Sequence, residues 1–83
     1  MFSPCVVIPT FDNPRTLRAV VERVRSHLTD VIVVDDGSGP EGLAVADDLE
    51  HDGLAFVHRR ARNGGKGAAV KDGLRVAFER GFT

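Results

Sequence analysis

Apolar residues in this chain gather into three short runs, at residues 5–8, 31–34 and 54–57. None of the runs alternates with polar residues, and the middle one consists of four β-branched side chains in succession. Such runs are typical of strands that are buried on both faces of a parallel sheet. The pattern therefore predicts strands over about residues 5–8, 30–35 and 54–58.

Between and after these runs, apolar residues recur three and four positions apart, which predicts amphipathic helices. We expect helices over about residues 14–28, 41–50 and 66–80, with Asn13 as the cap of the first and Gly81 ending the last. The positions expected to face the sheet are Leu17, Val20, Val21, Val24, Leu28, Leu43, Ala46, Leu49, Ala69, Val70, Gly73, Leu74, Ala77 and Phe78.

The predicted element order is β-α-β-α-β-α, with short connections throughout. Right-handed crossovers between such units produce one parallel sheet with helices on both faces. We therefore expect a single three-layer α/β domain over residues 1–83, Rossmann-like, with strand order 3-2-1. The strand at residues 5–8 would keep an unpaired edge, and an open edge favours self-association.

Composition narrows the class of protein. The chain has 83 residues with 11 basic and 12 acidic side chains, so neither a nucleic-acid surface nor an acidic tail is indicated. One cysteine excludes an internal disulfide, and no apolar stretch approaches the roughly 20 residues of a membrane span. No signal peptide is indicated. We expect a cytoplasmic protein, with peripheral attachment to the inner face of a membrane left open.

The central run ends in Asp35-Asp36-Gly37-Ser38. Open α/β sheets bind ligands at the carboxyl ends of their strands. A carboxylate there can accept hydrogen bonds from the N–H groups of a nucleobase or from ribose hydroxyls. The alternative is that one of the acids caps the next turn. Because side chains alternate along a strand, Asp35 and Asp36 can take one role each.

A second candidate segment is the glycine-rich stretch Arg62–Ala69, which leads into the last predicted helix. Helix N-termini favour phosphate, and Arg62 and Lys66 add positive charge. Lys66 is followed by glycine, so the segment is not a Walker A motif, and its glycine spacing departs from the dinucleotide-binding pattern. A phosphate contact and a tight structural loop both remain open interpretations.

The third segment, Pro9–Asp12, follows the first strand and should lie at the same edge. Phe11 could flank a flat base, or it could pack at the entrance of the helix. The three histidines show no metal-ligand spacing, and Cys5 lies in a predicted buried strand. We therefore predict no catalytic residue and no metal ligand in this chain.

Together, the segments Val7–Asp12, Val33–Ser38 and Arg62–Ala69 resemble the N-terminal half of family 2 glycosyltransferases, closest to the dolichol- or polyprenyl-phosphate mannosyltransferase type. The resemblance implies a GT-A fold, a UDP- or GDP-linked sugar donor, a divalent metal (Mg or Mn) and usually an inverting transfer. In the full-length family, the acceptor can be linked to a membrane. The family usually has tyrosine where Phe11 stands and often asparagine where Asp12 stands.

Carried over by position, the resemblance implies that Pro9, Thr10, Phe11 and Asp36 cradle the base and ribose. Asp36 would accept a hydrogen bond from the base edge, and Arg62 and Lys66 would lie near the nucleotide. The expected substrate-binding residues are Pro9, Thr10, Phe11, Asp12, Asp35, Asp36, Arg62 and Lys66.

The family's D-x-D metal motif, catalytic base and acceptor site follow later strands that this sequence does not contain. The resemblance thus implies a truncated, nucleotide-sugar-binding half-domain that is inactive alone. The alternative is a non-catalytic nucleotide-binding or interaction module. A receiver-like signalling domain fits less well, because the loop at residues 63–67 has no role there.

Overall fold

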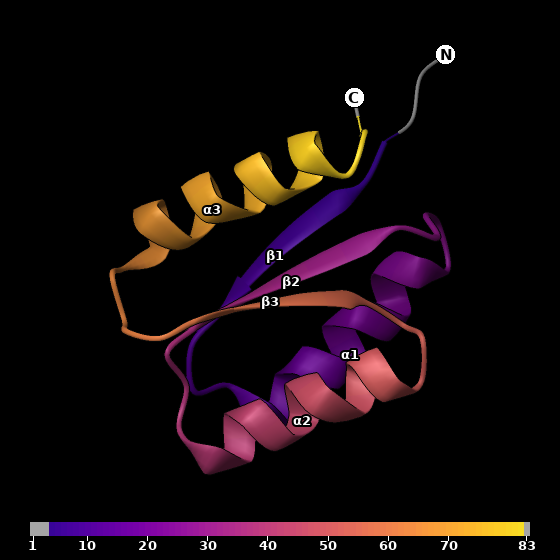
Figure 1. The fold of residues 1–83 in the computed structure, drawn as a ribbon. Helices are drawn as coiled ribbons and strands as arrows, with labels where there is room; N and C mark the ends of the chain where they lie inside the picture. The colour runs from indigo at the N-terminus through magenta and orange to yellow at the C-terminus, as the bar shows by residue number, and fades with distance from the viewer. Residues whose placement is uncertain (1–3, 83) are drawn as a thin grey trace.

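Three strands alternate with three helices in the computed structural model, which describes residues 4–82 (Figure 1). The strands are β1 (Val6–Thr10), β2 (Val31–Asp36) and β3 (Phe56–Arg60), and the helices are α1 (Pro14–Arg25), α2 (Pro40–His51) and α3 (Lys66–Glu79). Across the described residues, no helix has the length and apolar character that crossing a bilayer requires. The predicted element order is confirmed.

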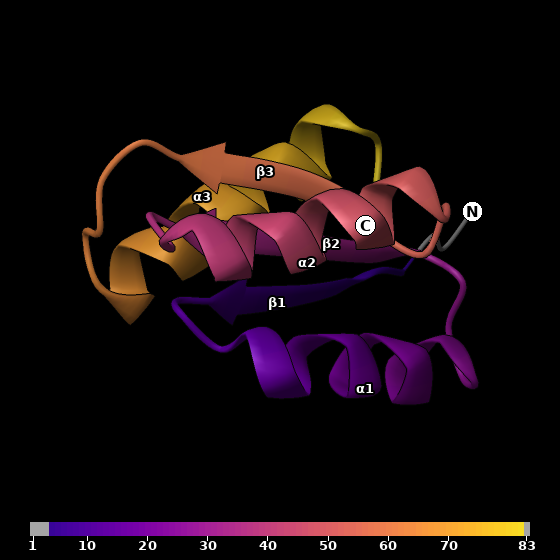
Figure 2. The same ribbon diagram turned by 90° about the horizontal axis from the view of Figure 1, so that it is seen from below.

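The strands form one parallel sheet in the order β1-β2-β3, which confirms the predicted order. Helices α1 and α2 cover one face of the sheet, and α3 covers the other (Figures 1 and 2). The fold is therefore the expected three-layer α/β arrangement, with β2 in its centre.

Strand β2 is buried along its whole length because it has a strand on each side and helices on both faces. Val31 and Val33 belong to the core cluster with α1 and α2, whereas Ile32 and Val34 belong to the cluster with α3. Because successive side chains point to opposite faces, this alternation also directs the two acids that end the strand.

Helix α3 lies very close to the sheet at Gly73. A Cβ atom at this position would lie 2.3 Å from Val7 Cγ1 and 3.0 Å from Val34 Cγ2. Real side chains do not approach so closely, so any larger residue would push the helix away from β1 and β2.

The structure corrects several element boundaries. Strand β1 continues through Pro9 and Thr10, which we expected in a loop. The Val6 N–H donates to Asp30 O, so the backbone N–H groups of residues 6, 8 and 10 face β2. The backbone at position 9 faces the open edge of the sheet, where the missing N–H of proline removes no hydrogen bond. Strand β3 begins two residues later than predicted and ends at Arg60. Helix α1 ends at Arg25, three residues early, where the N–H groups of Ser26 and His27 bond three residues back, to Arg23 O and Val24 O, in a tightened turn.

Three residues that we expected to be buried are exposed, so this part of the core prediction was wrong. Leu74 is 59% exposed, Phe78 is 82% exposed, and Val20 on α1 is 44% exposed. The buried stripe of α3 consists instead of Ala69, Gly73, Val76 and Ala77. Among the described residues, β1 is an edge strand of the sheet, so the flank of α3 that extends beyond it has no neighbour to cover it.

Gly73→Ala should destabilise the fold by about 1–3 kcal/mol, because the added methyl group overpacks the contact between α3 and the sheet. Gly67→Ala is the matched control, since no atom lies within 4 Å of a Cβ at that position of the same helix. It should be neutral or stabilise by up to about 1 kcal/mol through higher helix propensity. Urea unfolding of both variants measures the difference, and equal effects would contradict the close approach.

Candidate functional site

A pocket of about 270 Å³ opens at the carboxyl edge of the sheet, where β1 and β2 end and α3 begins. We call it the carboxyl-edge pocket. Its lining residues are Pro9, Thr10, Phe11, Asn13, Asp36, Asn63, Gly65, Lys66 and Ala69. The three segments singled out in the sequence therefore meet at one place, and Thr10, Asp36 and Lys66 lie on the wall of the same pocket.

Asp36 is the most firmly held side chain of the carboxyl-edge pocket, and it is only 3% exposed. Its Oδ1 accepts hydrogen bonds from Arg60 Nη1 at 2.7 Å and from the backbone N–H of Gly64 at 3.0 Å. Its Oδ2 accepts the N–H of Gly65 at 2.9 Å. These bonds, that of Gly64 foremost, lower the pKa of Asp36 below its ordinary value, so the carboxylate stays ionised.

Two residues outside the predicted set of site residues fix Asp36 in place, Arg60 directly and Asp72 through Arg60. Arg60 lies opposite Asp36 in the register of β2 and β3, and its Nε also contacts Asp72 Oδ2 at 2.9 Å. Asp72, on α3, lies 3.5 Å from His58 Nε2 as well. An acid and an arginine at the ends of neighbouring parallel strands can be expected to form an ion pair. We predicted that β3 ends at His58, which left Arg60 outside the strand and its pairing with Asp36 unpredicted.

Asp35 and Asp12 lie outside the carboxyl-edge pocket and hold turns. Asp35 Oδ2 accepts the backbone N–H of Ser38 at 3.1 Å, and Ser38 Oγ accepts the N–H of Asp12 at 2.8 Å. Asp12 Oδ1 accepts the N–H of Gly39 at 2.7 Å. The two acids of β2 thus point to opposite faces, as strand alternation predicted, and Asp35 takes the turn-holding role.

The loop between β3 and α3 crosses directly over the end of β2. Gly37 has a φ of 82°, and a Cβ there would lie 2.7 Å from Asn63 N and 2.9 Å from the carbonyl carbon of Arg62. Only glycine allows this approach. Arg62 itself is exposed and does not line the carboxyl-edge pocket. Asn63, which does line it, belonged to the predicted glycine-rich segment but was not singled out.

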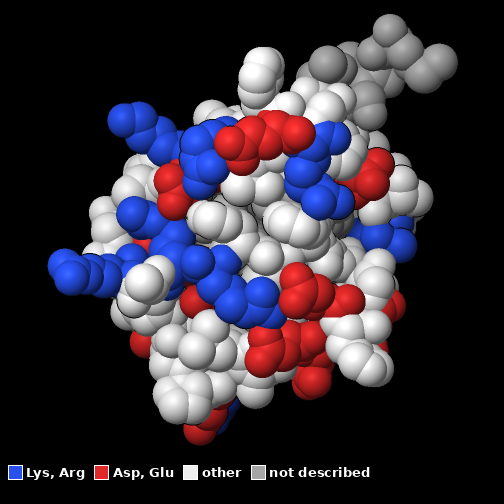
Figure 3. Space-filling model, viewed as in Figure 1, with Lys and Arg blue, Asp and Glu red and all other residues white. Residues whose placement is uncertain are grey.

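The remaining walls of the carboxyl-edge pocket suit a ligand that is flat at one end and anionic at the other. The ring of Phe11 is 44% exposed beside Asp36 and Thr10. Lys66 is the first residue of α3, where free N–H groups and the helix dipole favour anions. Figure 3 shows basic side chains gathered on the left side, toward the carboxyl ends of the strands in that view.

The residues described here do not fit a divalent metal ion. Such ions need several carboxylate or carbonyl oxygens around one point. Asp35 and Asp36 point to opposite faces, and both oxygens of Asp36 already accept protein hydrogen bonds. Within residues 4–82, no group of three or more acids, histidines or cysteines is placed to hold a metal.

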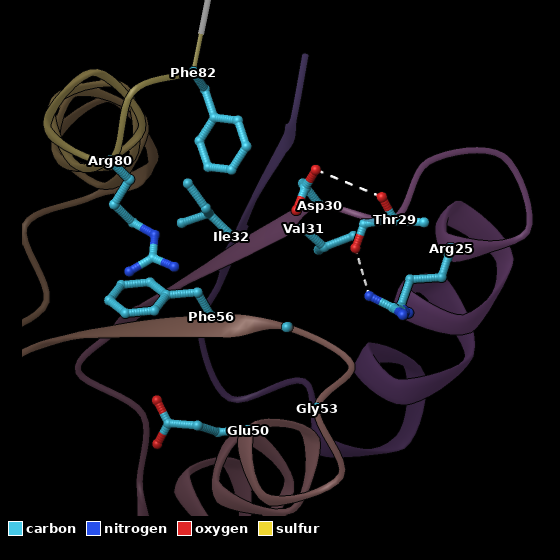
Figure 4. A pocket seen from close by; sticks show the side chains of 11 residues that line it. Arg25, Thr29, Asp30, Val31, Ile32, Glu50, Gly53, Phe56, Arg80 and Phe82 are labelled. Atoms are coloured by element: carbon cyan, nitrogen blue, oxygen red, sulfur yellow. Dashed lines mark hydrogen bonds between the residues drawn. The ribbon is translucent and has the colours of Figure 1, made fainter. Parts of the chain in front are cut away.

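A second pocket, of about 250 Å³, lies at the opposite, amino end of β2 and β3 (Figure 4). Its arginines are already engaged by the protein. Arg80 lies over the Phe56 ring, 3.9 Å from the centroid, and Arg25 donates to the carbonyl oxygens of Thr29 and Leu54. It contains none of the three sequence segments, so the carboxyl-edge pocket is the candidate site.

The bonds to Asp36 make a prediction about pH. Because the pKa of Asp36 is lower in the folded chain, the unfolded chain binds its proton more tightly, and stability falls as the pH falls. The contribution should be complete above the ordinary aspartate pKa of about 3.9 and disappear as the pH drops through the lowered value. Asp36→Asn should be less stable at pH 7 and lose less on acidification.

Thermal unfolding followed by circular dichroism at pH 7, 5, 4 and 3 checks this prediction. Asp48→Asn is the control, since Asp48 is an exposed acid on α2, away from the carboxyl-edge pocket. It should keep the acid sensitivity of the unchanged chain. If Asp36→Asn and the unchanged chain lost stability in parallel between pH 5 and 3, the bonds to Asp36 would not stabilise the folded state.

Comparison with known proteins agrees with this arrangement. A search of curated proteins finds no match to the chain. The family model described as glycosyl transferase family 2 matches residues 5–80, which include all three strands and all three helices. The chain therefore belongs to glycosyl transferase family 2.

Proposed function

We propose that the carboxyl-edge pocket binds the nucleotide part of a sugar donor, a nucleoside diphosphate linked to a sugar. The single observation that carries this proposal is the convergence of Thr10, Asp36 and Lys66 on one pocket of a family 2 chain. Membership of the family supports a nucleotide-sugar donor in general.

The base and ribose would lie against β1 and β2. Phe11 offers an exposed aromatic face for a planar base, and stacking of this kind contributes about 1–3 kcal/mol per base. Asp36 offers an ionised carboxylate oxygen to polar groups on the ligand, and the buried residue Thr10 forms the neighbouring part of the pocket wall. Both are held by strand backbone, which fixes them before the ligand arrives.

The diphosphate would lie toward the start of α3. Lys66 can pair with it, and the first N–H groups of the helix point in the same direction. A point charge such as lysine is common at phosphate sites. Arg62, one residue before Asn63 on the same loop, could reach the diphosphate only by swinging toward it.

Sugar transfer is a separate matter, and we propose that this chain does not perform it alone. The acids near the carboxyl-edge pocket are bonded to loops, so the divalent metal expected for the family would be held by other residues. The metal, the choice between UDP and GDP, a membrane-linked acceptor and the polyprenyl-phosphate mannosyltransferase subtype remain predictions from the resemblance.

Titration of the full chain with UDP and GDP, followed by amide NMR shifts, tests donor binding. At least one diphosphate should bind and shift the amides of Thr10, Gly65 and Ala69. Lys66→Ala should weaken binding about fivefold, the order expected for losing one charge-assisted contact.

Lys71→Ala is the matched control, because Lys71 is an exposed lysine of α3 that does not line the carboxyl-edge pocket. It should leave affinity unchanged. Equal losses from the two variants, or shifts confined to Phe56 and Arg80 at the opposite pocket, would contradict the proposed site.

A second candidate function is association with another copy through the open edge of β1. The specific observation is the exposed apolar flank of α3 beside that edge, where Leu74 and Phe78 adjoin a groove formed with Cys5 and Val7. The other edge strand carries protecting charges, since Arg59 of β3 pairs with acids of α2. A second copy supplies both a strand edge and a matching apolar flank.

Sedimentation at increasing concentration tests this association. The unchanged chain should form dimers or larger species, and Phe78→Asp should remain monomeric because it places a charge in the apolar flank. Val20→Asp is the control: it charges an exposed apolar residue on α1, on the other face of the sheet, and should still associate. A clean monomer of the unchanged chain at several hundred micromolar would contradict the interaction.

A further inference from the structure

Asp72 lies on the flank of α3 that faces β3, and it does not line the carboxyl-edge pocket. Its Oδ2 lies 2.9 Å from Arg60 Nε and 3.5 Å from His58 Nε2. His58 and Arg60 are two positions apart on β3, so their side chains point to the same face of the sheet, the face that α3 covers. Asp72 therefore connects the middle of α3 to the end of β3.

The guanidinium group of Arg60 bridges two acids. Its Nη1 donates to Asp36 Oδ1 at 2.7 Å, and its Nε lies 2.9 Å from Asp72 Oδ2. A guanidinium group presents its donors in a planar fork, so partners on two sides fix the orientation of the whole group. The Arg60 side chain is 22% exposed, which leaves little room for water to replace either acid. Asp72 thus controls how Arg60 is presented to Asp36.

Without Asp72, the charged end of Arg60 would keep only one of its two carboxylate partners. An arginine side chain has many rotamers, and one partner restricts them less than two. A guanidinium group that turned away would leave Asp36 with the N–H groups of Gly64 and Gly65 alone. It would also leave the loop backbone, since a Cβ at Gly64 would lie 2.6 Å from Arg60 Nη1. Asp36 and Gly65 line the carboxyl-edge pocket, so its wall would loosen.

The negative charge of Asp72 acts in the opposite direction. A nearby carboxylate repels an anionic ligand and raises the pKa of a neighbouring carboxyl group. Through its charge alone, removing Asp72 would therefore strengthen the binding of a diphosphate and lower the pKa of Asp36. The N–H of Gly64, and after it the guanidinium of Arg60, lower that pKa in the folded chain. Through the loss of a positioned Arg60, removing Asp72 would weaken binding and raise the pKa of Asp36.

We propose that Asp72 is a positioning residue for nucleotide binding, which acts from outside the carboxyl-edge pocket by holding Arg60 against Asp36. The effect on binding rests on the proposed function, whereas the positioning of Asp36 can be measured without a ligand. Helix α3 then serves the site twice, with its N-terminus and with a side chain from its middle.

The test compares Asp72→Ala with Glu79→Ala, which removes another arginine-paired acid from the same helix. NMR follows the side-chain carboxyl carbon of Asp36 from pH 7 downward, without ligand and while the native amide signals persist. Asp72→Ala should raise the pKa of Asp36, and Glu79→Ala should leave it unchanged. In calorimetric titrations of the full chain with UDP and GDP, Asp72→Ala should weaken binding about threefold, the order expected for one loosened hydrogen bond. Glu79→Ala should keep the affinity of the unchanged chain.

Arg60→Gln separates an effect that passes through Arg60 from any other effect of Asp72. In this background the guanidinium group that Asp72 holds is absent, so adding Asp72→Ala should cause no further loss of affinity. The two single variants and the double variant together form a double-mutant cycle, which measures this dependence directly.

The outcomes separate this inference from the proposed function. An unchanged or lower pKa of Asp36 in Asp72→Ala would overturn the positioning role, whatever the affinity does. The same loss of affinity with and without Arg60 would also overturn it, since Asp72 would then act by another route. Failure of both UDP and GDP to bind the unchanged chain would overturn the proposed function and the binding role of Asp72 together. A raised pKa of Asp36, with weaker binding that requires Arg60, would support the inference.

Discussion

The candidate site depends on one carboxylate. Asp36 ends the central strand and accepts the backbone N–H groups of Gly64 and Gly65, so it fastens the β3–α3 loop to the sheet. This loop leads directly into Lys66 and the N-terminus of α3. Together with the close packing of the loop on Gly37, these bonds fix the wall that faces Phe11 and Thr10. The same bonds lower the pKa of Asp36 and so keep the carboxylate ionised.

Strand alternation explains why two adjacent acids do different work. The even-numbered residues of β2 face α3 and the odd-numbered ones face α1 and α2, so Asp36 and Asp35 cannot serve the same pocket. Asp35 instead holds the turn after β2, and Ser38 and Asp12 extend that contact to the end of β1. One face of the strand end therefore builds the carboxyl-edge pocket, and the other face holds together the loops that surround it.

Much of this could be predicted from the sequence, because burial determines it. The apolar runs gave the strands, the helical spacing gave the helices, and right-handed crossovers left β2 in the centre. The convergence of Thr10, Asp36 and Lys66 follows from the parallel direction of the strands. Prediction failed where the neighbours of a residue, rather than its spacing, decide its burial. The spacing of Leu74 and Phe78 matches a buried stripe, but β1 is an edge strand, and within residues 4–82 nothing covers them. Likewise, a two-residue error in β3 separated Arg60 from Asp36, its partner in the register.

The number of protein hydrogen bonds at Asp36 bears on the role proposed for it. A carboxylate that accepted no protein hydrogen bonds would be free to meet any donor pattern, but it could not position the loop that completes the carboxyl-edge pocket. A carboxylate with all of its acceptor positions occupied, about four in number, would hold the loop and leave nothing for a ligand. Asp36 lies between these limits, with three positions occupied by Arg60, Gly64 and Gly65. The bonds that build the pocket therefore also limit how many further donors the Asp36 carboxylate can receive.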